Sequence, residues 1–211
     1  MFRSITLWLI PVSVLLSSFV NFQMPATAQT LYPFNADYDI FATAKDLTPN
    51  LEQIFLSGSS TNAPYGLTKV DSLSYSQTNF NTGEYAFNTD PTAFDLQGLP
   101  SGYVTFSGSD GDKLFGAESG TGLIDFKTLT VKSTGTVNIT GGEGKFKGST
   151  GTFVSSQVQP LSLQIGVNLK GQAQTSGSFK TIPEPGTATA LISLGAIGVI
   201  SIMRRRLQQS V

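Results

Sequence analysis

The chain contains no cysteine and no histidine among its 211 residues. Without cysteine no disulfide can hold the fold, so apolar burial and hydrogen bonding between strands must stabilise it. Histidine-based metal sites, Ser-His-Asp triads and Cys-His dyads are excluded as well. Charge is scarce, since only 13% of the residues are Asp, Glu, Lys or Arg. The segment 29–181 holds nine scattered lysines against 13 carboxylates, which does not suggest a nucleic-acid partner.

The first 28 residues have the three parts of a secretory signal peptide. A short basic start precedes an apolar stretch, and Ala26 and Ala28 form the small-x-small pattern that signal peptidase cleaves. Cleavage would leave Gln29 as the new N-terminus. The alternative is an uncleaved membrane helix, which Pro11 within the apolar stretch disfavours. We therefore expect signal peptidase to be a processing partner and residues 1–28 to lie outside the fold.

The C-terminal end carries a second apolar run, from Ala188 to Met203, followed by Arg204, Arg205 and Arg206. A helix of these 16 residues covers roughly 24 Å, which is less than a hydrocarbon core of about 30 Å. As a permanent anchor the run is therefore marginal. The positive-inside bias would hold the arginines on the cytoplasmic side, which places the preceding domain outside.

Pro183-Glu184-Pro185, an apolar helix predicted at 187–203 and the terminal arginines follow one another in this order. With these elements the segment 182–211 resembles the PEP-CTERM sorting signal of Gram-negative bacteria. The resemblance implies recognition by a membrane-embedded exosortase and cleavage near Pro-Glu-Pro. It also implies a membrane-anchored precursor, a final location at the cell surface or outside the cell, and association with extracellular polysaccharide. The two prolines favour an extended segment that a processing enzyme can bind.

The middle segment, 29–181, has the pattern of an all-β domain, with short alternating segments between turn signals. The clearest segment is 161–170, where five apolar residues occupy odd positions. Its phase continues to Phe179, which predicts one long strand bent at Gly171. A second clear strand is predicted at 129–140. Weaker strand candidates are 38–43, 53–59, 67–76, 84–88, 103–107, 114–119 and 151–157.

About eight to nine such strands would leave open edges in a flat sheet, so we expect a single antiparallel β-barrel rather than a two-sheet sandwich. Glycines within the strands favour the barrel. Between the first strands, 45–51 could form a helical turn that Pro49 limits. The stretch 135–153 resembles a strand-turn-strand element of small barrels related to allene oxide cyclases and dirigent proteins. That resemblance implies the fold only, because no catalytic residue of those families can be matched.

Two stretches invite ligand-binding interpretations. The Gly-rich stretch 139–151 fails as a phosphate loop because its Gly-Lys pair is followed by Phe146 instead of Ser or Thr. We interpret it as a turn that buries this phenylalanine. The stretch 109–113 is interpreted as a hairpin turn. The alternative is a calcium loop, for which Asp110 and Asp112 supply only two carboxylates.

Acid–base chemistry could rest only on carboxylates, and a glycosidase needs two of them facing one cleft. No carboxylate stands in a distinguishing pattern, although Glu118 and Asp125 flank Gly120-Thr121-Gly122 and are expected near one end of the barrel. The aromatic residues are expected in the core rather than on a sugar-stacking platform. The carboxylates considered are Glu84, Asp95, Glu118, Asp125 and Glu143.

Together these observations predict an exported, non-enzymatic protein of the cell surface or extracellular matrix, with no cofactor and no metal. The alternative is a binding module whose barrel mouth or aromatic face holds a small apolar molecule or a polysaccharide. Two further interpretations are less favoured. One is an isomerase of the allene oxide cyclase type, and the other is an ice-adsorbing protein, for which the sequence has no regular Thr-x-Thr array.

Overall fold

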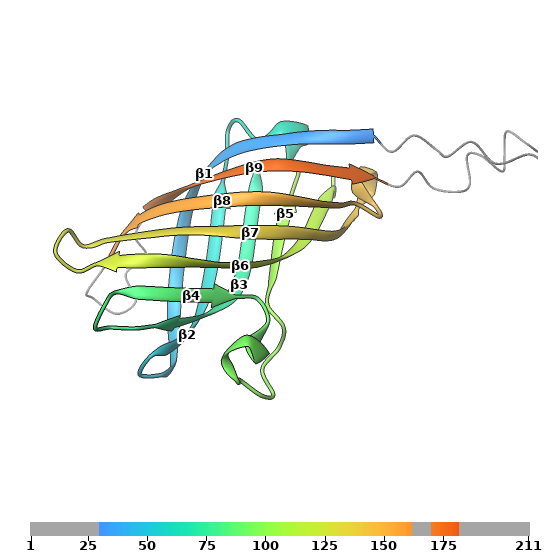
Figure 1. Ribbon diagram of the computed structural model, residues 1–211. Helices are drawn as coiled ribbons and strands as arrows, with labels where there is room; N and C mark the ends of the chain where they lie inside the picture. The colour runs from blue at the N-terminus through green and yellow to red at the C-terminus, as the bar shows by residue number, and fades with distance from the viewer. Residues whose placement is uncertain (1–29, 162–169, 182–211) are drawn as a thin grey trace, which may run out of the picture.

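The computed structural model describes residues 30–161 and 170–181, which form nine β-strands and three short 3₁₀ turns (Figure 1). The turns are η1 (Pro64–Gly66), η2 (Pro91–Phe94) and η3 (Gly144–Phe146). The strands are β1 (Thr30–Thr48), β2 (Leu51–Ser59), β3 (Lys69–Thr78), β4 (Glu84–Asn88), β5 (Tyr103–Ser107), β6 (Lys113–Asp125), β7 (Thr130–Glu143), β8 (Thr150–Pro160) and β9 (Lys170–Thr181).

These strands form one antiparallel sheet in the order β2-β1-β9-β8-β7-β6-β4-β3-β5. Two further pairings, of β2 with β3 and of β5 with β6, close the sheet in a ring. Each described strand therefore has at least two hydrogen-bonded neighbours, which removes the open edges that promote aggregation. The predicted all-β antiparallel fold with a closed sheet is confirmed.

The two ends of the ring differ in what lies there. Thr30 at the start of β1 pairs with Thr181 at the end of β9, so the described chain enters and leaves at one end (Figure 1). We call this the terminal end. The hairpin turns that join β1 to β2, β3 to β4 and β6 to β7 lie at the opposite end, which we call the distal end (Figure 1).

The pairing register fixes which side chains point into the ring. Residues opposite one another in an antiparallel pair share a face, and successive residues alternate between faces. Phe34 on β1 is opposite Gly177 on β9, which in turn is opposite Phe153 on β8. The inward-facing positions of the other strands follow from their pairing in the same way.

Aromatic side chains pack the terminal half of the interior. The rings of Phe34 and Phe153 stack with centroids 4.6 Å apart, and those of Tyr32 and Phe179 stack at 5.0 Å. Phe146 from η3 packs edge-on against Phe179 at 5.2 Å and is 1% exposed. The domain is thus stabilised without disulfides by a core of large apolar side chains.

The segment 89–102, which joins β4 to β5, covers part of the outer face of the ring. Tyr75 points outward on β3 yet is fully buried, and its hydroxyl donates a hydrogen bond to the Pro100 carbonyl at 2.7 Å. Gln53 on β2 donates to the Tyr75 hydroxyl at 3.3 Å. This small outer cluster explains why Gln53 and Tyr75 are buried although they lie on the outer face of β2 and β3.

Several strand predictions need correction. The possible helical turn at 45–51 is wrong, because β1 continues to Thr48 and Pro49 and Asn50 form the turn into β2. Leu67 lies before β3, and β7 extends to Glu143. Most of the strand predicted at 161–170 lies outside the described residues, and its continuation to Phe179 is β9.

The expectation for the aromatic residues is confirmed in part. Tyr75, Phe87 and Phe106 are at most 9% exposed, whereas Tyr103 and Phe126 are 46% and 44% exposed on the surface. Within 30–161 and 170–181, no helix has the length and apolar character needed to cross a membrane. The helix predicted at 187–203 lies outside the described residues.

Candidate functional site

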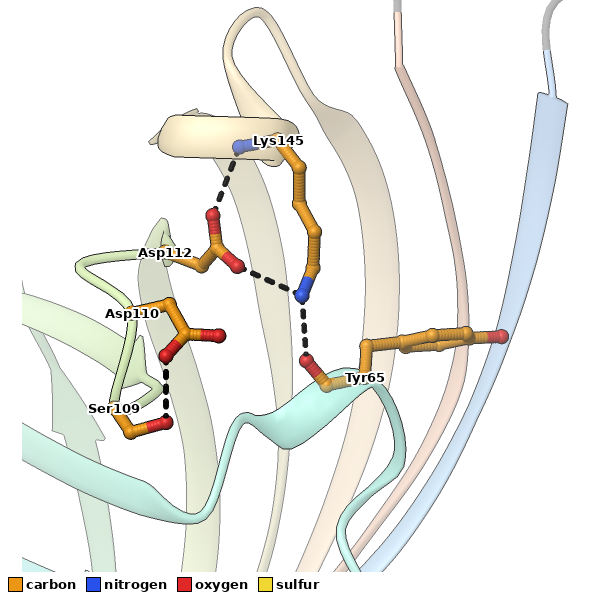
Figure 2. A network of polar contacts seen from close by, with 5 residues as sticks. All are labelled: Tyr65, Ser109, Asp110, Asp112 and Lys145. Atoms are coloured by element: carbon orange, nitrogen blue, oxygen red, sulfur yellow. Dashed lines mark hydrogen bonds and ion pairs between the residues drawn. The ribbon is translucent and has the colours of Figure 1, made fainter.

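Polar contacts between three loops seal the terminal end of the ring (Figure 2). Lys145 of η3 places its Nζ 2.7 Å from Oδ2 of Asp112 and donates from the same nitrogen to the Tyr65 carbonyl at 3.0 Å. The Lys145 backbone N–H donates to Oδ1 of Asp112 at 2.9 Å. Because both carboxylate oxygens are bonded to Lys145, the pKa of Asp112 is lowered from its ordinary value.

This network decides two of the sequence interpretations. The stretch 109–113 is the turn between β5 and β6, as expected, and Asp112 is committed to Lys145 (Figure 2). Asp110 instead accepts a hydrogen bond from Ser109 at 3.1 Å. The Gly-rich stretch is likewise confirmed as a turn that buries Phe146 beneath the network. Nowhere in the described ranges do three or more Asp or Glu side chains gather as metal ligands would.

The distal half of the interior contains many hydroxyl side chains beside its apolar ones, in contrast to the aromatic terminal half. On β3 the inward-facing residues after Val70 are all hydroxylic, and they stand opposite inward residues of β2 and β4. Hydroxyl side chains also point inward from β7, β8 and β9. The inward-facing hydroxyl residues of the distal half are Ser72, Ser74, Ser76, Thr78, Ser133, Ser155 and Thr175, all of them buried.

Glu118 on β6 is a buried carboxyl within this polar half. It faces inward opposite Val137, is only 9% exposed, and has the Ser72 hydroxyl as its hydrogen-bond partner. Removal from water disfavours the charged form, so burial raises the pKa of Glu118 to about 7, and the Ser72 hydrogen bond offsets this only in part. The carboxyl therefore titrates close to neutral pH.

The backbone around Glu118 is fixed by Thr89, at the point where β4 ends. The Thr89 N–H donates to the Glu118 carbonyl at 2.9 Å, and the Glu118 N–H donates to Thr89 Oγ1 at 3.2 Å. Since the chain leaves the wall between Asn88 and Tyr103, Glu118 lies beside the gap between β4 and β5. The position of Glu118 is thus set by the segment 89–102 as well as by strand pairing.

The interior opens toward the distal end. Along β1 the inward-facing residues change from Ile40, fully buried, through Ala42, half-buried, to Ala44, exposed. Along β8 they change from buried Phe153 to half-buried Gln157. The inward-facing side chains of β1 and β8 are therefore more exposed at this end, whereas the aromatic cluster and the Lys145 network cover the other.

Two acidic residues line the open end. Asp46 on β1 and Glu52 on β2 are directly opposite one another and both face inward. The pKa of Glu52 is raised, first by burial and second by the nearby charge of Asp46. Like charges placed opposite in a sheet destabilise it, so this pair is unfavourable unless a cation lies near it.

The carboxylates considered from the sequence do not gather in one cleft. Asp125 lies at the distal end, but its Oδ1 accepts from the backbone N–H groups of Lys127 and Thr128 at 2.8 and 3.1 Å. The hydrogen bond from the Thr128 side chain, followed by these two backbone bonds, lowers the pKa of Asp125. Glu118 points into the ring, so these two do not share a site. The remaining three are on the surface, namely Glu84, Asp95 and Glu143.

The sequence analysis missed the inner hydroxyls and the Asp46–Glu52 pair. The signal for the hydroxyls was present, because Ser72, Ser74 and Ser76 share the odd-even phase of Val70. Hydroxyl residues are usually found on the solvent face, so the alternation alone does not predict their burial.

Comparison with known families identifies one segment of the chain. Residues 181–206 match the PEP-CTERM protein-sorting motif, as the sequence resemblance predicted. This motif marks an exported protein that exosortase processes. No curated protein and no solved structure matches the chain, so the likeness to allene oxide cyclases and dirigent proteins stays a prediction.

The residues that carry the sorting and processing predictions lie outside the described ranges. The matched segment does include Pro183, Glu184, Pro185 and the arginines 204–206. The signal-peptidase site at Ala26, Ala28 and Gln29 stays a prediction from the sequence.

Proposed function

We propose that this protein is a non-enzymatic component of the extracellular matrix, made as a membrane-anchored precursor and freed by exosortase. The observation that carries the proposal is the place of the sorting motif relative to the ring. β9 ends at Thr181, and Pro183 follows two residues later. Cleavage near Pro-Glu-Pro therefore leaves every described strand, and the closed ring they form, intact.

The same geometry orients the domain during sorting. Because β9 leads directly into the motif, the terminal end of the ring faces the membrane while the precursor is anchored. The aromatic cluster and the Lys145 network lie at that end. The open, polar distal end points away from the membrane, toward the surroundings of the cell.

Association with polysaccharide is supported by the outer face of β7, β8 and β9. Outward-facing hydroxyl and amide side chains form rungs across the three strands, such as Thr134, Ser156 and Gln174. Each of these side chains is exposed and can both donate and accept hydrogen bonds. Such a surface suits the hydroxyl groups of a glycan.

The delivery step is tested with the variant Pro183→Ala/Glu184→Ala/Pro185→Ala in the full-length chain. We expect the wild-type protein in the extracellular fraction at reduced mass and the variant in the membrane fraction at precursor mass. Glu84→Ala, which removes an exposed surface carboxylate, is the matched control and should behave as wild type. Release of the triple variant with the same mass as wild type would contradict the proposal.

The matrix step is tested on the polar outer face. Thr134→Glu/Gln174→Glu should shift the protein from the polysaccharide fraction to the free fraction of an anionic matrix, because added carboxylates are repelled. Thr43→Glu/Ser57→Glu adds the same charge to exposed positions of β1 and β2 and should stay bound. Equal release of both variants would locate the contact elsewhere, and wild type free in every fraction would refute the association.

A further inference from the structure

We infer that the distal half of the ring interior is a binding site for a small hydroxylated ammonium compound, with an amino sugar as the fitting chemical class. The inference goes beyond the proposed function, because it concerns the interior of the ring and not sorting or the outer face. The lining that carries it consists of Glu118, the inner hydroxyls and two aromatic rings.

The first observation is an uncompensated negative lining. Glu118, Glu52 and Asp46 face inward. Among the strand residues that the structure describes, each lysine is outward by register, including Lys113 and Lys170, which pair with Glu143 and Asp39 at 2.8 and 2.9 Å. The interior therefore offers its carboxylates no basic side chain from the wall. A bound cation would provide the missing countercharge.

The second observation is a set of inner hydroxyls with no protein partner. Ser74, Ser76, Ser155 and Thr175 are 5%, 4%, 7% and 3% exposed. No side-chain hydrogen bond joins them to another residue within 30–161 and 170–181. In the same ranges only Ser149 Oγ is both unpaired and shut off from solvent, so each of these four hydroxyl oxygens keeps some contact with solvent.

The third observation is an apolar wall beside Glu118. Phe87 lies opposite Gly120 and Tyr85 opposite Gly122 on β6. A Cβ on either glycine would collide with the facing ring, so the two rings lie close against the glycine backbone. Their centroids are 6.3 Å apart. The apolar face of a sugar ring packs well on such aromatic groups.

These three features select among ligand classes. An apolar molecule would leave the four hydroxyls without partners and the carboxylates without a countercharge, which is costly for buried groups. A neutral sugar would satisfy the hydroxyls but not the carboxylate. An anionic sugar would be repelled by all three carboxylates. An ammonium group on a hydroxylated ring satisfies both kinds of lining, since Ser and Thr hydroxyls both donate and accept hydrogen bonds.

The test is calorimetric titration of the purified extracellular protein with glucosamine, at a pH where the amine is charged. Glucose and N-acetylglucosamine are the matched ligands without a positive charge. We expect saturable binding of glucosamine only. Loss of a charge-assisted hydrogen bond weakens binding by roughly 10- to 100-fold, so Glu118→Gln should show a loss of that order, whereas Glu84→Gln should bind as wild type.

Three outcomes would overturn the inference: no saturable binding of glucosamine, equal binding of glucose, or unchanged binding by a folded Glu118→Gln variant. Should Glu118→Gln fail to fold, Ser155→Ala and Ser74→Ala take its place. Each should weaken glucosamine binding several-fold through the loss of one inner hydroxyl. A folded Ser155→Ala/Ser74→Ala double variant with wild-type affinity would also overturn the inference. Failure here leaves the sorting and matrix tests unaffected.

Discussion

Glu118 makes the stability of the domain depend on pH in a direction that can be calculated. Burial raises its pKa from 4.5 to about 7 in the folded protein. The folded state therefore holds the proton more tightly than the unfolded chain does. As the pH rises from about 4.5 to about 7, unfolding becomes coupled to proton release, and the free energy of unfolding falls. At about 1.4 kcal/mol per unit of pKa difference, the loss amounts to about 3 kcal/mol.

The perturbation that isolates this effect is Glu118→Gln, which keeps the shape of the side chain and removes the charge. At pH 4 the two proteins should have similar stability, because both side chains are neutral. At pH 9 the variant should be more stable than wild type by about 3 kcal/mol, since only wild type buries a charge. Comparing the two proteins cancels the titration of all other groups.

Urea unfolding followed by far-UV circular dichroism at pH 4, 6, 7.5 and 9 measures the difference in free energy of unfolding between the two proteins. The curve of the stability difference against pH should change mainly between pH 5 and pH 8. Parallel curves for wild type and variant would show that Glu118 is hydrated in the folded state, and this would refute both its burial and the raised pKa. A variant less stable than wild type at pH 9 would mean that the charged form has a countercharge.

Three further substitutions probe the rest of the fold. Phe153→Ala removes a fully buried ring from the aromatic cluster. Urea titration should show a free energy of unfolding lower by about 3–5 kcal/mol. A loss below about 1 kcal/mol would mean that the cluster is not packed. Gly120→Ala should lower the free energy of unfolding by roughly 1–3 kcal/mol, because its Cβ would lie 2.5 Å from the Phe87 ring and against the Thr134 carbonyl. An unchanged melting temperature would contradict the pairing register of β4 with β6. Lys145→Ala removes an ion pair whose lysine side chain is 49% exposed, so thermal unfolding should change by less than about 1 kcal/mol; a larger loss would make the network essential to the fold.

Alternation of apolar and polar residues was enough to predict an all-β domain, its approximate strands and a closed sheet. It works because each strand buries one face, as in Val131, Val137 and Ile139 on β7. The same rule failed at 45–51, where Pro49 was taken as a limit on a helix although Pro and Asn together favour a turn between strands. Local sequence does not distinguish these alternatives, because pairing of β1 with β2 decides the outcome.

The candidate site was harder to predict than the fold. Glu118 is unremarkable in sequence, because its burial depends on β6 passing the gap where β4 ends and β5 begins. The inner serines follow the apolar phase of β3, but their burial becomes evident only when the ring closes through the pairing of β2 with β3. The sorting motif was predictable in full, since recognition of a linear signal depends on local sequence.

The most direct test of the central claim is intact-mass analysis of the protein recovered from outside the cell. We expect a single species that begins at Gln29 and ends between Thr181 and Pro185, because exosortase processing near Pro-Glu-Pro removes the tail and spares β9. A mass that includes residues 187–211, or a cleavage within 30–181 that cuts the ring, would contradict the claim that the motif releases an intact closed sheet.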